Sequence, residues 1–286
     1  MKTSTEIGSA AKLVGEEKAV ELVAQAGFDA WDFSMFAMVR YDWSSHCLLD
    51  NDHPLTQPNY LRFVRELRKI GEDNDIHCNQ SHAPFPSSHP GVRSYMKRAI
   101  ECTAEVGGKM VIIHPNNDAT PEENAAFYAE LLPFAKEHGV KIATENMWNW
   151  DSAANCAVPC ACSTPESFNA HLDAVNDPNF VACLDIGHAE MKGLGTSAVE
   201  MIHALGSRLQ ALHIHDNDRH HDSHMIPFAG KIDFAAIVQA LKATGYGGYL
   251  TLEADTYLKN YTPDAVLVGL RQLAAAARNL KEMYEA

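Results

Sequence analysis

The chain has 286 residues, which suits one large domain although length alone would allow two, and its formal net charge is −14. This charge disfavours nucleic acid as a partner, because a polyanion requires clustered Lys and Arg residues and the sequence has no such cluster. The sequence also excludes a membrane span, which needs roughly 20 apolar residues, and its seven cysteines, without disulfide-like spacing, predict a reducing cytoplasm.

Short apolar runs alternate with helical patterns along the chain. Strands are predicted at 4–7, 28–33, 76–82, 110–114, 140–145, 180–185, 209–215 and 249–253. Helices are predicted at 16–26, 59–75, 92–106, 121–138, 166–175, 197–205, 234–243 and 263–284. Two long connections, 34–58 and 146–165, carry aromatic residues, and we expect the first of them to form a lid.

This alternation makes eight strand–helix units and implies parallel strands. Eight such strands predict an α/β fold, a single-domain (β/α)8 TIM barrel over residues 1–286, with its active site at the carboxyl ends of the strands. A doubly wound open sheet is the alternative. The first turn, Gly8-Ser9-Ala10, lacks the G-x-G-x-x-G pattern that such a sheet would favour.

Four predicted strands end in metal-ligand side chains, namely Glu145, Asp185, His213 and Glu253. A single acid at a strand end is as compatible with a salt bridge or a helix cap, but four at corresponding positions favour a shared site. Three carboxylates and one imidazole suit Mn²⁺, Mg²⁺ or Co²⁺. The sequence therefore predicts one divalent ion at the barrel mouth, with Zn²⁺ as the alternative.

Further polar and aromatic residues follow the predicted strands. We expect them to contact the substrate or to support or extend the metal site, although each alone is as compatible with an ordinary loop residue. They are His82, His114, Trp148, His188, His215, Asp222 and His224. His213 and His215 point to the same face of their strand, so that either could bind the ion.

The motifs at Leu184–His188, His213–Asp216 and Leu252–Glu253, with Glu145 in Thr-Glu-Asn, resemble the xylose isomerase-like TIM-barrel superfamily of sugar and sugar-phosphate isomerases and epimerases. The resemblance covers nearly the whole chain. In its ketose 3-epimerase branch the metal quartet would fall on the four residues named above. It further implies that Glu145 and Glu253 move protons, that His188 holds a substrate oxygen, and that the chain forms a homodimer or homotetramer. The His-x-x-Asp pattern favours His213 over His215.

The function expected from this resemblance is a divalent-metal-dependent sugar or sugar-phosphate isomerase or epimerase. The two glutamates would act as acid and base on the carbon next to the carbonyl, and the ion would stabilise the enediolate. The partner is a small-molecule sugar. Arg40, Arg219 and Lys231 are candidates to meet a substrate phosphate, although a solvated surface role is favoured for each.

Two other activities fit the same residues. The superfamily includes endonuclease IV, and a three-zinc phosphodiesterase of that kind would add His82, His114, His188, Asp222 and His224 to the quartet. The acidic charge balance favours the sugar enzyme over this alternative. A keto-sugar or inositol lyase or dehydratase would share the enediolate step, and a barrel that only binds a sugar or a protein is disfavoured by the intact pair of glutamates.

Overall fold

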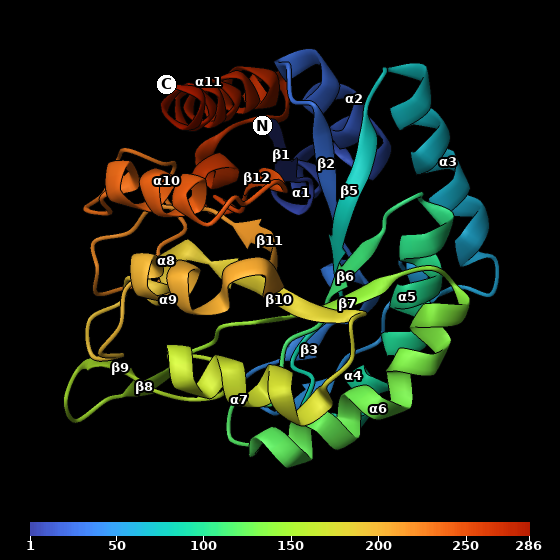
Figure 1. Cartoon of the computed structure of the whole chain (residues 1–286). Coiled ribbons are helices and arrows are strands. Elements are labelled where there is room, and N and C mark those ends of the chain that lie inside the picture. Colours follow the sequence, from blue (N-terminus) through green and yellow to red (C-terminus); the bar gives the residue numbers. More distant parts are fainter.

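The computed structural model describes residues 1–286, and it confirms the predicted ring of eight parallel strands surrounded by helices (Figure 1). Neighbours in the ring follow the order β11-β10-β7-β6-β5-β2-β1-β12. The strands are β1 (Lys2–Glu6), β2 (Ala30–Ser34), β5 (His77–His82), β6 (Met110–Ile112), β7 (Lys141–Glu145), β10 (Phe180–Asp185), β11 (Leu209–His213) and β12 (Tyr249–Leu252). The ring closes through a parallel bridge between Ile214 and Leu252, in which the Ile214 amide donates to the Thr251 carbonyl at 2.9 Å.

The helices form the outer layer, and each of the larger ones follows a barrel strand. They are α1 (Gly8–Val14), α2 (Glu16–Ala26), α3 (Tyr60–Asp73), α4 (Pro90–Arg93), α5 (Met96–Glu105), α6 (Pro121–Glu137), α7 (Pro165–Val175), α8 (Ile186–Ala189), α9 (Ala198–Leu205), α10 (Phe234–Ala243) and α11 (Val266–Glu285). Local sequence sets several boundaries. Thr120 and Glu123 form a capping box with Pro121 at the first position of α6, and Gly27, with φ of 93°, ends α2.

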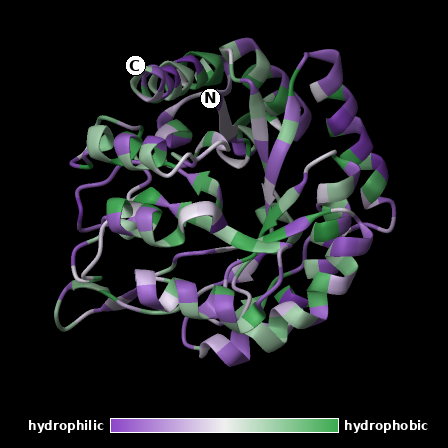
Figure 2. Ribbon diagram, viewed as in Figure 1, coloured by the Kyte–Doolittle hydropathy of each residue, from purple (hydrophilic) through white to green (hydrophobic).

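Apolar side chains fill two separate regions. The larger one, between the strands and the helices, contains fully buried Trp31, Phe33 and Phe168. The smaller one lies inside the barrel and consists of Ile112, Ala143, Val181, Cys183 and Ala211. The barrel strands differ accordingly in hydropathy. In Figure 2, β10 is mostly hydrophobic whereas β5 is largely hydrophilic. No helix is long and apolar enough to cross a membrane.

The rest of the barrel interior is polar, and a β-bulge in β5 contributes to this. Trp31 of β2 pairs with Cys78, but the next residue, Asp32, pairs with Gln80, so that Asn79 is an extra residue. Asn79 and Gln80 both face inward. The Asn79 side chain accepts a hydrogen bond from Ser4 at 2.6 Å, and the Gln80 side chain donates one to Asp32 at 2.9 Å.

The long connections contain more structure than the sequence predicted. Residues 34–58 hold a hairpin of β3 (Tyr41–Asp42) and β4 (Cys47–Leu48), flanked by short 3-10 helices η1 (Phe36–Met38) and η2 (Pro54–Thr56). Residues 146–165 hold a second hairpin, β8 (Asn149–Asp151) and β9 (Cys156–Val158). The remaining 3-10 turns are η3 (Gly206–Arg208), η4 (Tyr257–Asn260) and η5 (Pro263–Ala265). Helix α1, which the sequence did not predict, begins where the Glu6 carboxylate accepts a hydrogen bond from the Ser9 amide.

Candidate functional site

Four strand ends converge at the mouth of the barrel. Glu145, Asp185 and His213 are the last residues of β7, β10 and β11, and Glu253 directly follows β12. Each of the four offers one ligand atom, and these atoms all lie within 4.8 Å of one another. His213 Nδ1 is 3.1 Å from Glu145 Oε1 and 3.2 Å from Glu253 Oε2. The residues that the sequence placed at one rim therefore do meet there.

The quartet carries surplus negative charge. Burial opposes ionisation of Glu145, but His213, His114 and His82 hold its pKa well below the usual range. Burial, followed by the charge of Glu145, raises the pKa of Glu253 well above its ordinary value. The two glutamates thus do not share the available positive charge equally, and a cation between them would compensate both.

An unpaired oxygen makes the quartet suitable for a metal ion. Asp185 Oδ2 is buried and has no hydrogen-bond partner, whereas Glu145 Oε2 has only the imidazoles of His82 and His114 beside it. Buried carboxylate oxygens without donors are costly, and coordination of a divalent ion would satisfy them. The donor set of three carboxylates and one imidazole could hold Mn²⁺, Mg²⁺, Co²⁺ or Zn²⁺.

His82 and His114 extend this centre on the side of Glu145. Their Nε2 atoms lie 3.4 Å and 3.3 Å from Glu145 Oε2, and the three residues form a second group that could hold an ion. Burial, together with the nearby His82, lowers the pKa of His114 to about 4. His114 is therefore a neutral imidazole at neutral pH, as a metal ligand or a hydrogen-bond partner of a sugar would be.

A third group lies on the other side of Asp185 and consists of His188, His215, Asp222 and His224. His188 Nε2 is 3.2 Å from Asp222 Oδ2, and its Nδ1 is 2.9 Å from the Asn146 carbonyl oxygen. Burial opposes protonation of His188, but Asp185 and Asp222 raise its pKa to about 10. The His215 ring stacks on the His224 ring with centroids 3.8 Å apart.

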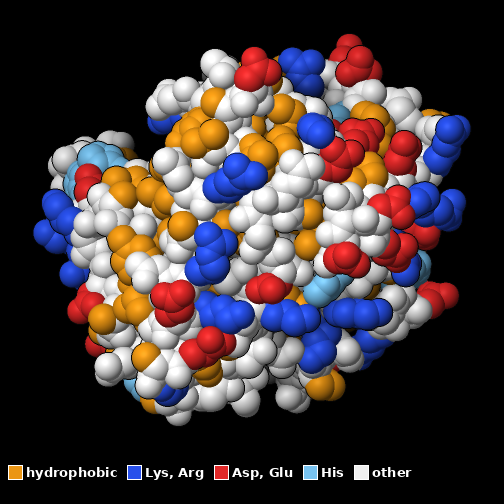
Figure 3. All heavy atoms as spheres, turned by 90° about the horizontal axis from the view of Figure 1, so that it is seen from above, with side chains coloured by type: hydrophobic (Ala, Val, Ile, Leu, Met, Phe, Trp, Pro, Cys, Tyr) orange, Lys and Arg blue, Asp and Glu red, His pale blue; other side chains and the backbone are white.

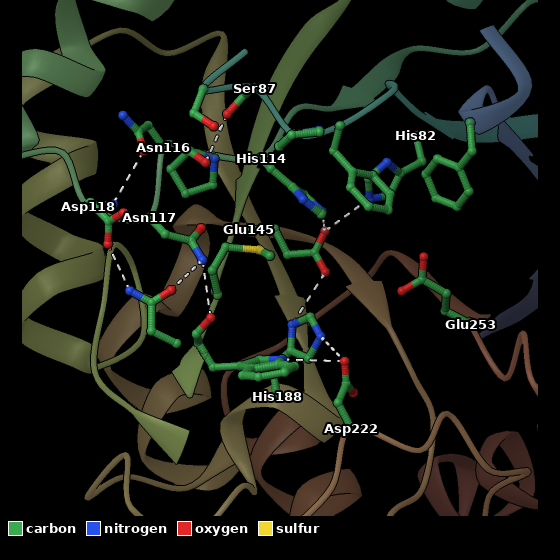
Figure 4. A pocket seen from close by; sticks show the side chains of 18 of the residues that line it. His82, Ser87, His114, Asn116, Asn117, Asp118, Glu145, His188, Asp222 and Glu253 are labelled. Atoms are coloured by element: carbon green, nitrogen blue, oxygen red, sulfur yellow. Dashed lines mark hydrogen bonds and ion pairs between the residues drawn. The ribbon is translucent and has the colours of Figure 1, made fainter. Parts of the chain in front are cut away.

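A cavity of about 480 Å³ opens above these groups (Figure 4). Most of the predicted site residues line it, namely His82, His114, Glu145, Trp148, His188, Asp222, His224 and Glu253. Asp185 and His213 are fully buried beneath it. Figure 4 shows Glu145, His188 and Asp222 joined by ion pairs, with Glu253 entering from a different direction than Glu145.

His215 differs from its predicted role in substrate binding. It is fully buried and does not line the cavity, because its ring lies behind His224. Its Nε2 atom is directed instead towards Asp185 Oδ1, at 3.1 Å, and Asp222 Oδ1, at 3.4 Å. The structure therefore places His215 between two carboxylates and away from the cavity.

Residues from the loops after β2, β5, β6 and β7 complete the cavity, and the sequence did not single them out as site residues. A polar wall consists of Ser87, Ser88, Asn116, Asn117, Asp118 and Asn149. An apolar wall consists of Phe36, Trp43, Phe85 and Met147, next to Trp148. Trp148 also donates from its indole nitrogen to Asp222 Oδ2 at 3.3 Å. No residue type among these signals a site, and only folding of the loops over the barrel mouth brings them together.

The cations considered for a substrate phosphate lie elsewhere. Arg219 pairs with Glu190 at 2.8 Å, Arg40 donates to the Asp50 carbonyl at 3.1 Å, and Lys231 is exposed. None of the three lines the cavity, and no Lys or Arg is among its lining residues. The walls instead carry Asp118, Asp222 and Asp255 in addition to the two glutamates.

Comparisons with known proteins agree with this architecture. A family profile described as "Xylose isomerase-like TIM barrel" matches residues 20–281. An uncharacterised protein of Methanocaldococcus jannaschii is 26% identical over 82% of this chain and 77% of its own length. A fructoselysine 3-epimerase of Escherichia coli O157:H7 is 26% identical over 46% of this chain and 45% of its own length.

Two solved structures show the same fold. A D-tagatose 3-epimerase-like protein superposes with a TM-score of 0.72 at 22% identity, over 100% of this chain and 98% of that one. The IOLI protein, described with a bound zinc atom, superposes with a TM-score of 0.69 at 18% identity, over 99% of this chain and 98% of that one.

Proposed function

Because the chain belongs to the xylose isomerase-like TIM barrel family, we propose that it is a divalent-metal-dependent sugar isomerase or epimerase. The observation that carries this proposal is the convergence of Glu145, Asp185, His213 and Glu253 within 4.8 Å, at the floor of a cavity that both glutamates enter. Two carboxylates beside one cation site are what proton transfer next to a sugar carbonyl requires.

In this proposal the quartet holds one ion, of the Mn²⁺, Mg²⁺, Co²⁺ or Zn²⁺ type. When bound, such an ion would supply Lewis-acid charge next to the substrate carbonyl. The buried, unpaired Asp185 Oδ2 atom supports this assignment, as does the zinc atom described for one structural neighbour.

The chain's own side chains would move the protons. One glutamate accepts the proton from the carbon next to the carbonyl on a carboxylate oxygen. For epimerisation the other glutamate returns a proton from the opposite face of that carbon. The different directions from which Glu145 and Glu253 enter the cavity support this division (Figure 4). His188 would donate from Nε2 to a substrate oxygen at the cavity wall, exchanging its contact with Asp222 Oδ2 at 3.2 Å for this hydrogen bond.

The lining of the cavity favours an unphosphorylated ketose. A phosphate would need Lys, Arg or a helix amino terminus for recognition, and the cavity has neither Lys nor Arg. Its asparagine and serine side chains offer neutral hydrogen bonds to hydroxyl groups, and its aromatic side chains can cover the sugar face. The names of two similar proteins, the fructoselysine 3-epimerase and the D-tagatose 3-epimerase-like protein, are consistent with this substrate class.

Incubation with free ketoses in deuterated water tests the proposal. We expect deuterium at the carbon next to the carbonyl and the appearance of an epimer or isomer, both read by NMR, with no reaction of the matching ketose phosphates. Loss of water or carbon–carbon cleavage in the product would identify the lyase or dehydratase alternative. Absence of exchange across the panel, with the metal-loaded protein, would contradict the proposal.

Phosphodiester cleavage is the second candidate function. One observation favours it. The metal quartet, the group with His82 and His114, and the group with His188, His215, Asp222 and His224 lie next to one another at the same rim. The acidic cavity, which no Lys or Arg lines, argues against it. On the face shown in Figure 3, several Lys and Arg side chains lie side by side with Asp and Glu side chains around them, but none of these cations lines the cavity. Metal analysis separates the two functions, since three zinc ions per chain would favour the phosphodiesterase and about one ion the sugar enzyme.

A further inference from the structure

Asp32 is a buried carboxylate that the proposed chemistry does not use. It lies on β2, is 1% exposed and does not line the cavity. It has no Lys or Arg partner. Its Oδ2 atom accepts a hydrogen bond from Gln80 Nε2 at 2.9 Å and lies 3.3 Å from His213 Nε2, and its Oδ1 atom has no partner. A buried charge held in this way is costly, so its contacts deserve an explanation.

The two ring nitrogens of His213 face different groups, and this accounts for the contact with Asp32. Nδ1 faces the cation site, where Glu145 Oε1 and Glu253 Oε2 lie at 3.1 Å and 3.2 Å. A neutral imidazole that binds an ion through Nδ1 must carry its proton on Nε2. The group next to Nε2 is Asp32 Oδ2, which can only accept when ionised. The carboxylate therefore stabilises the tautomer that leaves Nδ1 free for the ion.

The position of Asp32 is itself fixed from inside the barrel. The Gln80 amide group donates both to Asp32 and to the Leu212 carbonyl, at 2.9 Å and 3.4 Å. Its carbonyl oxygen accepts from Asn79 at 3.2 Å and from Thr251 at 3.4 Å, which sets the orientation of the amide. The bulge in β5 places Asn79 and Gln80 side by side in this network.

We propose that Asp32 is a positioning residue that holds His213 in the tautomer and orientation needed to bind the ion, with Gln80 holding Asp32. This inference rests on the proposed metal site, but it does not depend on which substrate is converted. Carboxylates that accept a hydrogen bond from a metal-bound histidine typically change metal affinity or activity about 10- to 100-fold when replaced.

Two variants of Asp32 give a graded test. Asp32→Leu removes the acceptor, and we expect the dissociation constant for Co²⁺ or Mn²⁺, measured by calorimetry on metal-free protein, to rise about 10- to 100-fold. Asp32→Asn keeps an oxygen that can accept from Gln80 and His213 but loses the charge, so its effect should be smaller. Asp29→Leu is the control, because Asp29 precedes β2, accepts from Thr3 and does not contact His213.

Two spectroscopic measurements separate positioning from a general loss of structure. Imidazole ¹⁵N and ¹H shifts of the Zn²⁺-loaded protein should show a proton on His213 Nε2 that is hydrogen-bonded in the wild type and loses this hydrogen bond in Asp32→Leu. The visible spectrum of the Co²⁺ form should change in the Asp32 variants and not in Asp29→Leu. If Asp32→Leu does not fold, Asp32→Asn alone decides the matter through the same measurements.

The outcomes distinguish this inference from the proposed function. Unchanged metal affinity with an unchanged His213 Nε2 proton shift in the Asp32 variants would overturn the role of Asp32. Weakened affinity in those variants would support it even if no ketose reacts, which would contradict only the proposed activity. A wild-type protein that binds no divalent ion would overturn both.

Discussion

The two halves of the barrel interior differ in chemistry. Strands β6, β7, β10 and β11 contribute the small apolar cluster of Ile112, Ala143, Val181, Cys183 and Ala211. Strands β12, β1, β2 and β5 contribute the hydrogen-bonded residues Thr251, Ser4, Asp32, Asn79 and Gln80. The apolar half fills space, whereas the polar half ends in a carboxylate next to a candidate metal ligand.

We therefore expect the apolar half to contribute mainly to the stability of the fold and the polar half also to the positioning of site residues. Glu145 extends from the apolar half, and Glu253 follows β12 of the polar half, so that the candidate site spans both. Variants in the apolar half should change the free energy of unfolding without changing the site, because cavities in a packed core act through lost contacts. Variants in the polar half should change the properties of the site as well.

The largest expected effect comes from the two glutamates at the rim. Glu145→Gln and Glu253→Gln should each lower turnover about 100- to 10,000-fold, because proton transfer by a positioned side chain contributes about that much. Epimer formation is followed by NMR, and circular dichroism checks that the barrel is folded. Glu166→Gln, at an exposed position of α7, is the matched control. Full activity in either rim variant would remove the acid–base assignment.

The next effect is expected in the apolar half. Ile112→Ala should lower the free energy of unfolding by about 2–5 kcal/mol, because the side chain is fully buried and leaves a cavity. Turnover per folded molecule and metal affinity should stay close to those of the wild type. Chemical denaturation measures the free energy of unfolding, and calorimetry measures the metal affinity. Val268→Ala, at an exposed residue, is the control. A large loss of metal affinity in Ile112→Ala would mean that the two halves do not have separate roles.

A smaller loss of stability, but a change in the site, is expected in the polar half. Gln80→Leu removes a donor to Asp32 and should lower the free energy of unfolding by about 1–3 kcal/mol. It should also weaken binding of Co²⁺, which Ile112→Ala should not. Gln25→Leu, at an exposed position of α2, is the control. Equal metal affinity in Gln80→Leu and the wild type would argue against support of the site by this half.

The smallest effect concerns Glu6, at the end of β1 in the polar half. Burial, followed by the charge of Asp255, raises its pKa from the ordinary value near 4.5. The folded chain therefore binds this proton more tightly than the unfolded chain, so that the contribution to stability is complete below pH 4.5 and is lost as pH rises through the raised pKa. The stability of the wild type relative to Glu6→Gln should therefore fall across this window.

Denaturation of both proteins in EDTA, from pH 4 to pH 8, measures this difference. The wild type should lose stability relative to Glu6→Gln as pH increases. A difference that is independent of pH, or one that increases with pH, would contradict the raised pKa of Glu6.

The sequence predicted the barrel and the quartet because both depend on regular features. Alternation of strands and helices implies the ring, and the carboxyl ends of parallel strands meet at one rim, so that Glu145, Asp185 and His213 could be located before the structure was known. The depth of a side chain is harder to predict. His215 shares a strand face with His213, yet the packing of the His224 ring keeps it away from the cavity.

Asp32, Gln80 and the cavity walls were not predicted as parts of the site. Regular alternation does not predict which side chains of β5 (His77–His82) face inward, because the bulge places Asn79 and Gln80 on the same side of the strand. The walls come from the loops after β2, β5, β6 and β7, whose positions over the barrel depend on contacts between distant segments, such as the hydrogen bond from Trp148 to Asp222. The cytoplasmic location, the homodimer or homotetramer and the roles of the individual site residues stay predictions.

The bulge in β5 also determines which residues of that strand face the interior of the barrel. Cys78 packs among the helices and Ser81 contacts Thr103 of α5, whereas Asn79, Gln80 and His82 all face the interior. Regular alternation from Cys78 onward would send Ser81 inward and press His82 against the helices. By absorbing one residue, the strand gains an additional polar side chain in the interior and still delivers an imidazole, not a hydroxyl, to the mouth of the barrel.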